Sequence, residues 1–200
     1  MTPTPETTAP ATRRTRLTPQ REAELYEAVL DLLREDGYDL LTMDAVAARC
    51  KCSKATLYRQ WQGKPRLVAA AMRHGRPFSL DDVDTGSLHG DLHELARRLG
   101  EAKKDVRLIR AVAPAVPRNA DLAEALRETL VQPEIDLIGT LLARAVARGE
   151  VAADAPAAAF VPHLLSGAVF ARPLIEQLDA DTDYLQRFLD AVVLPVLTRR

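Results

Sequence analysis

The stretch TMDAVAARCKCSKATLYRQWQGK, residues 42–64, decides the fold of this chain. It has the pattern of two short helices joined by a tight turn, with Thr42 and Ser53 at N-cap positions. The segment Ala45–Arg76 holds eight Lys or Arg residues and no Asp or Glu. Such a basic block inside a helical pattern is typical of a surface that faces nucleic-acid phosphates. The alternative is a basic face that is merely solvated.

Helical spacing separates these residues into an inward and an outward set. The inward positions, which should form the core of the helix pair, are Val46, Ala47, Leu57 and Trp61. The outward positions, which we expect to contact DNA, are Thr42, Lys51, Ser53, Lys54, Ala55, Thr56, Tyr58, Arg59 and Lys64. Lysine can donate to guanine, Ala and Thr methyl groups can contact a thymine methyl, and helix starts favour phosphate. The pattern therefore predicts a helix–turn–helix whose second helix lies in the major groove.

The flanking sequence predicts further helices and no strands. Thr18-Pro19 should start a helix that Gly37 ends, and another should start near Lys64 behind Gly63. Beyond residue 86 the helical stretches are expected at about Leu88–Lys104, Val106–Val112, Asp121–Arg148, Pro156–Glu176 and Asp183–Leu197. A kink is expected where Pro133 interrupts the third of these. The prediction is an all-α chain of about nine helices.

Charge and composition divide the chain into three parts. Residues 1–76 carry 13 basic and 9 acidic side chains, a net of +4, whereas residues 77–200 carry 14 and 19, a net of −5. This asymmetry indicates that nucleic-acid contact is confined to one end. We expect a flexible basic arm at 1–17, a helix–turn–helix domain at 18–76 and a larger helical domain at 77–200. Arg13, Arg14 and Arg16 of the arm could reach a minor groove or only keep the tail soluble.

Composition also bears on location. No apolar run is expected to reach the length of about 18 residues that a membrane span needs, and the N-terminus lacks the apolar region of a secretory signal. Only two cysteines occur, Cys50 and Cys52, too close in sequence to bridge readily. This usage favours a cytoplasmic protein with no membrane partner.

The run Thr56-Leu57-Tyr58, followed by an aromatic residue at Trp61 and by Lys64, resembles the TetR family of bacterial transcriptional regulators. The resemblance extends from about Leu25 to Met72. Two positions depart from the family pattern: Lys51 stands where the family usually has Gly, and Cys52 where it usually has a small apolar residue. A Lys with positive φ in the turn would cost roughly 1 kcal/mol.

The resemblance implies a homodimeric DNA-binding regulator, most often a repressor, that a small molecule releases from a (pseudo)palindromic operator. Its C-terminal helices would then form both the dimer interface and the effector pocket. The wide apolar faces of 157–175 and 184–197 could belong to the core of one protomer, but two adjacent ones at the chain end suit a helical dimer interface. For that interface we expect Phe170, Leu174, Leu185, Phe188 and Val192, and for the effector pocket His163 and Phe170. Core packing is the alternative for His163 and Phe170.

The remaining candidates favour binding over catalysis. Cys50 and Cys52 are expected to be small core residues, with a redox role as the alternative. The four histidines show no Cys or carboxylate partner at ligand spacing, so no metal or cofactor is expected. His89 and His93 lie four residues apart beside Glu94, so a surface pair is expected there, with a metal site as the alternative. No nucleophile–base pair or phosphate-binding Gly loop is visible, so we expect no enzyme. The rival interpretation is a helical scaffold or small-molecule binder without specific DNA function.

Overall fold

The computed structural model describes residues 17–75, 83–101 and 106–198, and within these ranges it contains helices and no strands. In the N-terminal part the helices are α1 (Pro19–Leu40), α2 (Met43–Arg49), α3 (Lys54–Trp61) and α4 (Lys64–His74). In the C-terminal part they are α5 (Leu88–Glu101), α6 (Val106–Val112), η1 (Ala113–Arg118), α7 (Ala120–Leu126), η2 (Arg127–Val131), α8 (Gln132–Ala147), η3 (Pro156–Phe160), α9 (Val161–Ile175), α10 (Thr182–Phe188), η4 (Leu189–Val193) and α11 (Leu194–Thr198).

Several of these elements run on without a break. If 120–147, 156–175 and 182–198 are each counted as one helix, and η1 is counted with α6, the described residues form nine helices. The predicted all-α fold is therefore confirmed. The arm with Arg13, Arg14 and Arg16 lies outside the described residues.

The helix starts of the N-terminal part follow from its capping residues. The side chains of Thr18, Thr42 and Ser53 each accept a hydrogen bond from a backbone N–H in the first turn of α1, α2 and α3. These bonds satisfy N–H groups that a helix start otherwise leaves without a partner. Gly37, with φ of 78°, leaves the helical conformation as predicted, although α1 resumes and ends at Leu40.

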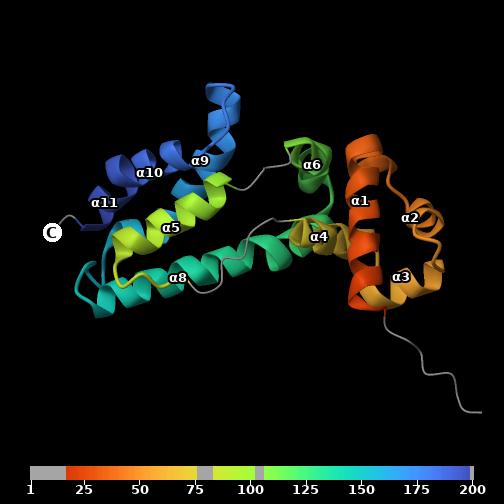
Figure 1. The fold of residues 1–200 in the computed structure, drawn as a ribbon, viewed down its shortest axis with the longest axis horizontal. Coiled ribbons are helices and arrows are strands. Elements are labelled where there is room, and N and C mark those ends of the chain that lie inside the picture. Colours follow the sequence, from red (N-terminus) through yellow and green to blue (C-terminus); the bar gives the residue numbers. More distant parts are fainter. Residues whose placement is uncertain (1–16, 76–82, 102–105, 199–200) are drawn as a thin grey trace, which may run out of the picture.

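One hydrophobic cluster joins the N-terminal helices to part of the C-terminal half. Its buried residues on α1, α3 and α4 include Val29, Leu57 and Leu67, and it continues into Leu108 of α6 and Leu122 of α7. We call this the head cluster, and residues 17–75 the head. Figure 1 shows α6 beside α1. It also shows α4 against the head end of the long helix that contains α8. The core thus crosses the boundary that charge suggested near residue 77.

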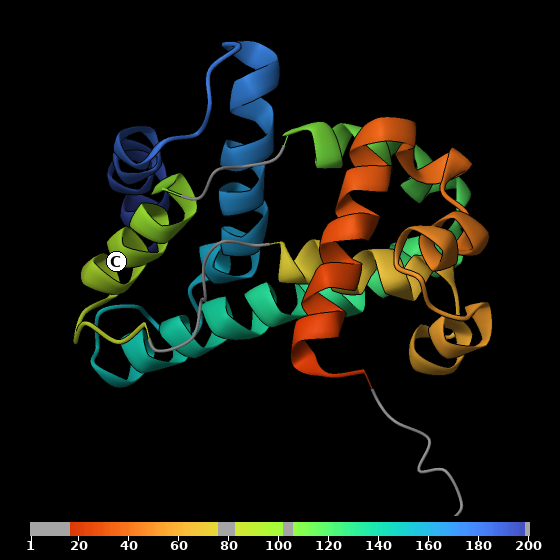
Figure 2. The same cartoon turned by 45° about the vertical axis from the view of Figure 1, so that its right-hand side comes forward.

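A second hydrophobic cluster, the body cluster, holds the other C-terminal helices together. It includes Leu92 of α5, Leu141 of α8, Leu165 of α9 and Leu189 of η4. Figure 2 shows α8 running from the head to the far end of the molecule, where α5, α10 and α11 lie together. We use "body" for residues 83–198.

Two π-helical segments interrupt the long helices, and each ends two residues before a proline. The segment η2 ends at Val131, before Pro133, and η4 ends at Val193, before Pro195. A proline has no N–H to donate and its ring clashes with the carbonyl four residues earlier, so the α-helical pattern is disturbed there. The irregularity predicted near Pro133 is therefore present, as a π segment.

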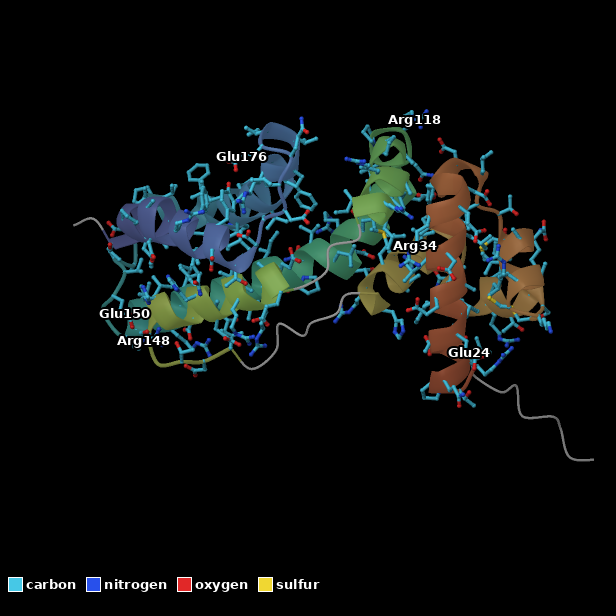
Figure 3. All side chains as sticks on the ribbon, turned by 45° about the horizontal axis from the view of Figure 1, so that its top comes forward. Glu24, Arg34, Arg118, Arg148, Glu150 and Glu176 are labelled. Carbon is cyan, nitrogen blue, oxygen red and sulfur yellow. The ribbon has the colours of Figure 1, made fainter. Side chains whose placement is uncertain are left out.

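Polar contacts fasten the start of α5 to the end of α8. The fully buried Asp91 accepts hydrogen bonds from the Thr85 N–H (2.6 Å) and hydroxyl (2.9 Å), and Arg148 Nη2 lies 3.6 Å from its other oxygen. Glu150 accepts a hydrogen bond from the Leu88 N–H at 2.6 Å and pairs with Arg148. Figure 3 labels Arg148 and Glu150 at this end of the molecule.

The stretch Pro156–Ile175 corrects one sequence expectation. By length and composition it is apolar enough to cross a membrane, although no run of that length was expected. Core helices of soluble proteins, which are mostly buried, pass the same test, whereas 22% of this window is buried. Arg172, near the C-terminal end of α9, is buried. Its guanidinium donates to the Asp179 carbonyl at 2.7 Å and to the Asp181 carboxylate at 3.0 Å.

Candidate nucleic-acid interface

The helix pair α2–α3 lies on the side of α1 opposite to α5 and α8 (Figure 1). Of its inward residues, Val46 and Leu57 are fully buried and Trp61 is nearly so, whereas Ala47 is half-buried against the same cluster. Trp61 packs edge-on against Tyr26 of α1, and its indole N–H donates to the Tyr26 hydroxyl at 3.3 Å. Packing of α3 against α1 in this core thus fixes the angle between the two helices.

A second set of contacts holds the pair to α1 from outside the core. The Arg21 guanidinium donates to the Cys50 carbonyl at 3.1 Å, at the end of α2, and Arg49 pairs with Glu35 at 2.8 Å. Tyr26 donates to Glu22 at 2.7 Å, and burial raises the pKa of this tyrosine to about 12. The Tyr26 hydroxyl therefore remains protonated and a donor throughout the physiological range.

The turn between the two helices is left-handed at Lys51. The φ of Lys51 is 50°, a left-handed conformation that costs a lysine more than the glycine usual at this position of the family. The Cys52 N–H donates to the Ala47 carbonyl at 3.0 Å, so the turn closes the end of α2. The Lys51 side chain is exposed beside the start of α3. A residue with a Cβ is thus held in a strained conformation next to the candidate DNA surface.

The exposed face of α3 carries four of the nine predicted contact residues. Lys54, Ala55, Tyr58 and Arg59 are exposed, with Tyr58 at 46%. Thr56 is half-buried, and its hydroxyl lies 2.8 Å from that of Ser53, so both belong to the cap of α3. The face thus presents two cations, a phenol and a methyl group in two helical turns.

Asp44 takes part in this surface in a way that sequence reasoning missed. Its carboxylate accepts a hydrogen bond from the Lys54 ammonium at 2.9 Å and raises the pKa of that lysine. In the sequence Asp44 is only an acidic residue in the first turn of α2. The ten-residue separation gave no signal of the pairing. This pair engages one of the three N–H donors of the Lys54 ammonium and leaves two for a base or a phosphate.

Lys64 is placed differently from the outward position expected of it. Its ammonium donates to the carbonyls of Tyr38 (2.8 Å) and Leu41 (2.9 Å) and lies 4.2 Å from the centre of the Tyr38 ring. Burial lowers the pKa of this ammonium. Lys64 thus ties the start of α4 to the end of α1, with its charge directed inward.

Several contacts connect the head to the body. The Asn119 amide donates to the Tyr38 hydroxyl at 3.3 Å, and Arg118 pairs with Asp39 at 3.0 Å (Arg118 is labelled in Figure 3). Arg73 of α4 donates to the Thr129 carbonyl at 3.3 Å. In an α-helix this carbonyl would accept from residue 133, but Pro133 has no N–H to donate. The π segment η2 therefore meets α4 directly.

The two cysteines pack against the head cluster. Both are half-buried free thiols, and burial raises the pKa of each. A raised pKa disfavours the thiolate, which is the reactive form. Their surroundings favour the packing interpretation over the redox one.

The residues expected at the dimer interface divide into three groups. Phe170 is 54% exposed and Leu174 82% exposed on α9, whereas Phe188 and Val192 are half-buried. Leu185 is 2% exposed, because it packs inside the body cluster. The expectation for Leu185 is therefore corrected: it is a core residue of the protomer and is not available to a second copy.

The predicted effector pocket is also corrected. His163 and Phe170 are both exposed on α9, so they do not line an enclosed pocket within the protomer. A hollow of about 660 Å³ lies at the end of α8 that is away from the head. It is lined by residues of α5, α11 and the segment after α8, among them Leu88, His89, Glu150, Leu194 and Leu197.

Comparisons with known proteins agree with this geometry. The family model "Bacterial regulatory proteins, tetR family" matches residues 25–71, and "Tetracyclin repressor-like, C-terminal domain" matches residues 82–192. The HTH-type transcriptional regulator Rv1556 of Mycobacterium tuberculosis is 39% identical over 180 residues, which cover 90% of this chain and 89% of that protein.

Two further relatives extend the comparison. The DNA-binding transcriptional repressor TetR of Mycobacteroides abscessus is 32% identical over 181 residues, covering 88% of this chain and 94% of its own. The crystal structure of the TetR family transcription regulator SCO0332 is similar with a TM-score of 0.61 at 26% identity, covering 90% of this chain and 100% of that one. The chain belongs to the TetR family of bacterial DNA-binding transcription regulators.

Proposed function

We propose that this regulator is a repressor that binds a pseudo-palindromic operator as a homodimer and leaves it when a small-molecule effector binds. The observation that carries the proposal is the exposed face of α3. Lys54, Tyr58 and Arg59 lie on it, and residues 45–75 contain no acidic side chain. A relative at 32% identity is named a DNA-binding transcriptional repressor, which supports the same direction of regulation.

On the operator, α3 lies in the major groove with Lys54 and Ala55 nearest the base edges. Tyr58, Arg59 and Lys51 contact phosphates, and Thr42 and Ser53 place two helix starts against the backbone. We keep Lys64 as a positioning residue, because its ammonium already serves two backbone carbonyls. Two such heads in a dimer fit half-sites about one helical turn apart, roughly 34–36 Å.

For the dimer we propose the exposed face of α9. Phe170, Leu174 and Ile175 form a run of large apolar side chains that are each more than half exposed. Soluble proteins seldom leave such a run uncovered, and a symmetric dimer covers it with the same surface of a second copy. Phe188 and Val192, which are half-buried, can extend the contact.

For the effector we propose the hollow at the far end of α8. Its volume of about 660 Å³ falls in the range of roughly 300–1,000 Å³ usual for small-molecule sites. The continuous helix 120–147 joins this end of the body to the packing of α7 against α4. An effector that favours one position of this helix would change the spacing of the heads.

Location and domain division follow the same proposal. A repressor acts on chromosomal DNA, so we place the protein in the cytoplasm and assign it no catalytic activity. The division into 18–76 and 77–200 is supported by the two family matches, at 25–71 and 82–192.

The test begins with the DNA that the purified protein selects from a genomic library. We expect Lys54→Ala and Tyr58→Ala each to weaken binding to the selected operator roughly 5- to 150-fold, the effect of about 1–3 kcal/mol per contact. Arg187→Ala removes an exposed cation from α10 in the body and should leave binding unchanged. Weak, non-selective binding that neither head variant alters would instead favour a scaffold or small-molecule binder.

A further inference from the structure

His89, His93 and Asp190 meet on the surface of the body, where α5 lies against η4. His93 Nε2 is 2.8 Å from Asp190 Oδ1, and His89 Nε2 is 3.5 Å from the same oxygen. The one donor atom that each residue offers lies within 4.8 Å of the other two. The two histidines are one helical turn apart on α5, and their rings stack with centroids 4.0 Å apart.

We propose that these three side chains bind a divalent transition-metal ion of the zinc class. Two histidines at positions i and i+4 of a helix present their nitrogens on one face, an arrangement that zinc sites use. Imidazole suits Zn²⁺, Ni²⁺ and Cu²⁺, and a carboxylate oxygen completes a set of three ligands.

The three donors are close enough for one ion once the side chains rotate, because the two imidazole rings stack nearly parallel and each must turn to direct its Nε2 at a common point. Zinc bonds to nitrogen and oxygen of roughly 2.0–2.2 Å place neighbouring donors of a tetrahedron about 3.3–3.6 Å apart. The His89–Asp190 distance of 3.5 Å already lies in that range, and the His93–Asp190 hydrogen bond at 2.8 Å has to lengthen slightly. His89 and Asp190 are more than half exposed, so rotation of their side chains is open to them.

The site would have a structural effect and an open position. It would link α5 to the π segment η4 through residues such as His93 and Asp190, which are 97 positions apart in sequence, and so fasten the body cluster from outside. Three protein ligands leave a fourth position for water or a ligand group. His89 also lines the hollow at the end of α8, so that position would lie near the proposed effector site.

The competing explanation is a simple hydrogen bond between His93 and Asp190 that needs no ion. The test uses full-length protein that has been dialysed against a chelator and is titrated with Zn²⁺ by isothermal calorimetry. We expect one Zn²⁺ per chain. His89→Gln and Asp190→Asn should each weaken binding by at least the roughly 10–100-fold that loss of an outer-shell partner costs.

Matched controls separate this site from other zinc ligands. His74→Gln and Asp183→Asn remove the same chemical groups elsewhere on the surface and should bind Zn²⁺ like the wild type. The double variant Cys50→Ser/Cys52→Ser should also keep the site, and Co²⁺ bound to the wild type should show no thiolate charge-transfer band. Zn²⁺ should raise the melting temperature of the wild type and not that of His89→Gln.

Two results would overturn the proposal. One is the absence of stoichiometric Zn²⁺ binding by the wild type. The other is binding that the cysteine variant loses while His89→Gln and Asp190→Asn keep it. Operator binding is measured separately on the same variants, so failure here would be distinguishable from failure of the proposed repressor function.

Discussion

The head and the body differ in how completely each covers its own apolar surface. In the head, α1 to α4 and the body helices α6 and α7 share one cluster, and polar contacts such as Arg21 to the Cys50 carbonyl close its edges. In the body, α9 leaves Phe170, Leu174 and Ile175 largely exposed, and its projecting end is marked by Glu176 in Figure 3. The head thus leaves Leu40 and Tyr58 as its large exposed apolar side chains, whereas α9 alone exposes three, which the proposed second copy would cover.

The largest effect is expected inside the head. Leu57→Ala removes a fully buried side chain from α3 and should lower the free energy of unfolding by about 2–5 kcal/mol. Denaturant unfolding measures this. The adjacent Tyr58→Ala changes an exposed side chain and should stay within about 0.5 kcal/mol while operator binding falls. Equal destabilisation by both variants would show that α3 is not packed as described.

The next effect concerns α9 and tests whether the body is completed by a second copy. Leu174→Glu places a charge on the exposed face and should weaken dimerisation by about 2 kcal/mol or more without unfolding the protomer. Sedimentation velocity measures the oligomeric state. Leu185→Glu should instead unfold the body, because Leu185 lies in its core. Dimers of undiminished strength in Leu174→Glu would move the interface away from α9.

A smaller effect is expected at the turn of the head. Lys51→Gly relieves a φ of 50° and should raise the free energy of unfolding by up to about 1 kcal/mol. The same change removes a cation from the candidate DNA surface, so operator affinity should fall while stability rises. Thermal unfolding and a binding titration on one preparation measure both. A loss of stability would mean that the Lys51 side chain holds the turn.

The smallest effect is expected in the reactivity of the two cysteines, which reports how well the head cluster is shielded from solvent. Burial raises the pKa of Cys50 and Cys52 above the usual value, so less thiolate is present near neutral pH than in an exposed thiol. Alkylation by iodoacetamide at pH 7.5 should therefore be slower in the folded protein than in urea, and should accelerate as the pH rises. Equal rates in both states would reopen the redox interpretation.

Local signals predicted the head well. Caps at Thr18, Thr42 and Ser53 act within one turn of the chain, so the sequence alone placed the starts of α1, α2 and α3 correctly. The sequence also marks the Lys51 turn as strained, because Lys stands there where the family usually has Gly. Long-range contacts were not readable, because the inward turn of the Lys64 ammonium depends on carbonyls 23 and 26 residues away.

Fewer contacts of the body could be predicted from the sequence. A wide apolar helix face looks the same whether it meets its own protomer or another, so Leu185 and Leu174 could not be told apart by periodicity. Asp190 lies 97 residues from His93, so no spacing rule could connect it to the histidine pair. The missed features are those that only tertiary packing creates.

The π segment η2 has a consequence for the spacing of residues along the long helix. At about 100° per residue, an unbroken α-helix would turn the side of Leu122 and Ala125 about 150° away from the side of Leu141 and Ala145. Leu122 belongs to the head cluster and Ala125 on the same side is also buried, whereas Leu141 and Ala145 belong to the body cluster. The extra residue of a π turn reduces this angle to about 50°, so one rod can serve both cores. Residues 127–131 are therefore the place where the long helix should tolerate loss of a single residue, whereas the same deletion early in α8 would turn one face by about 100° relative to the other.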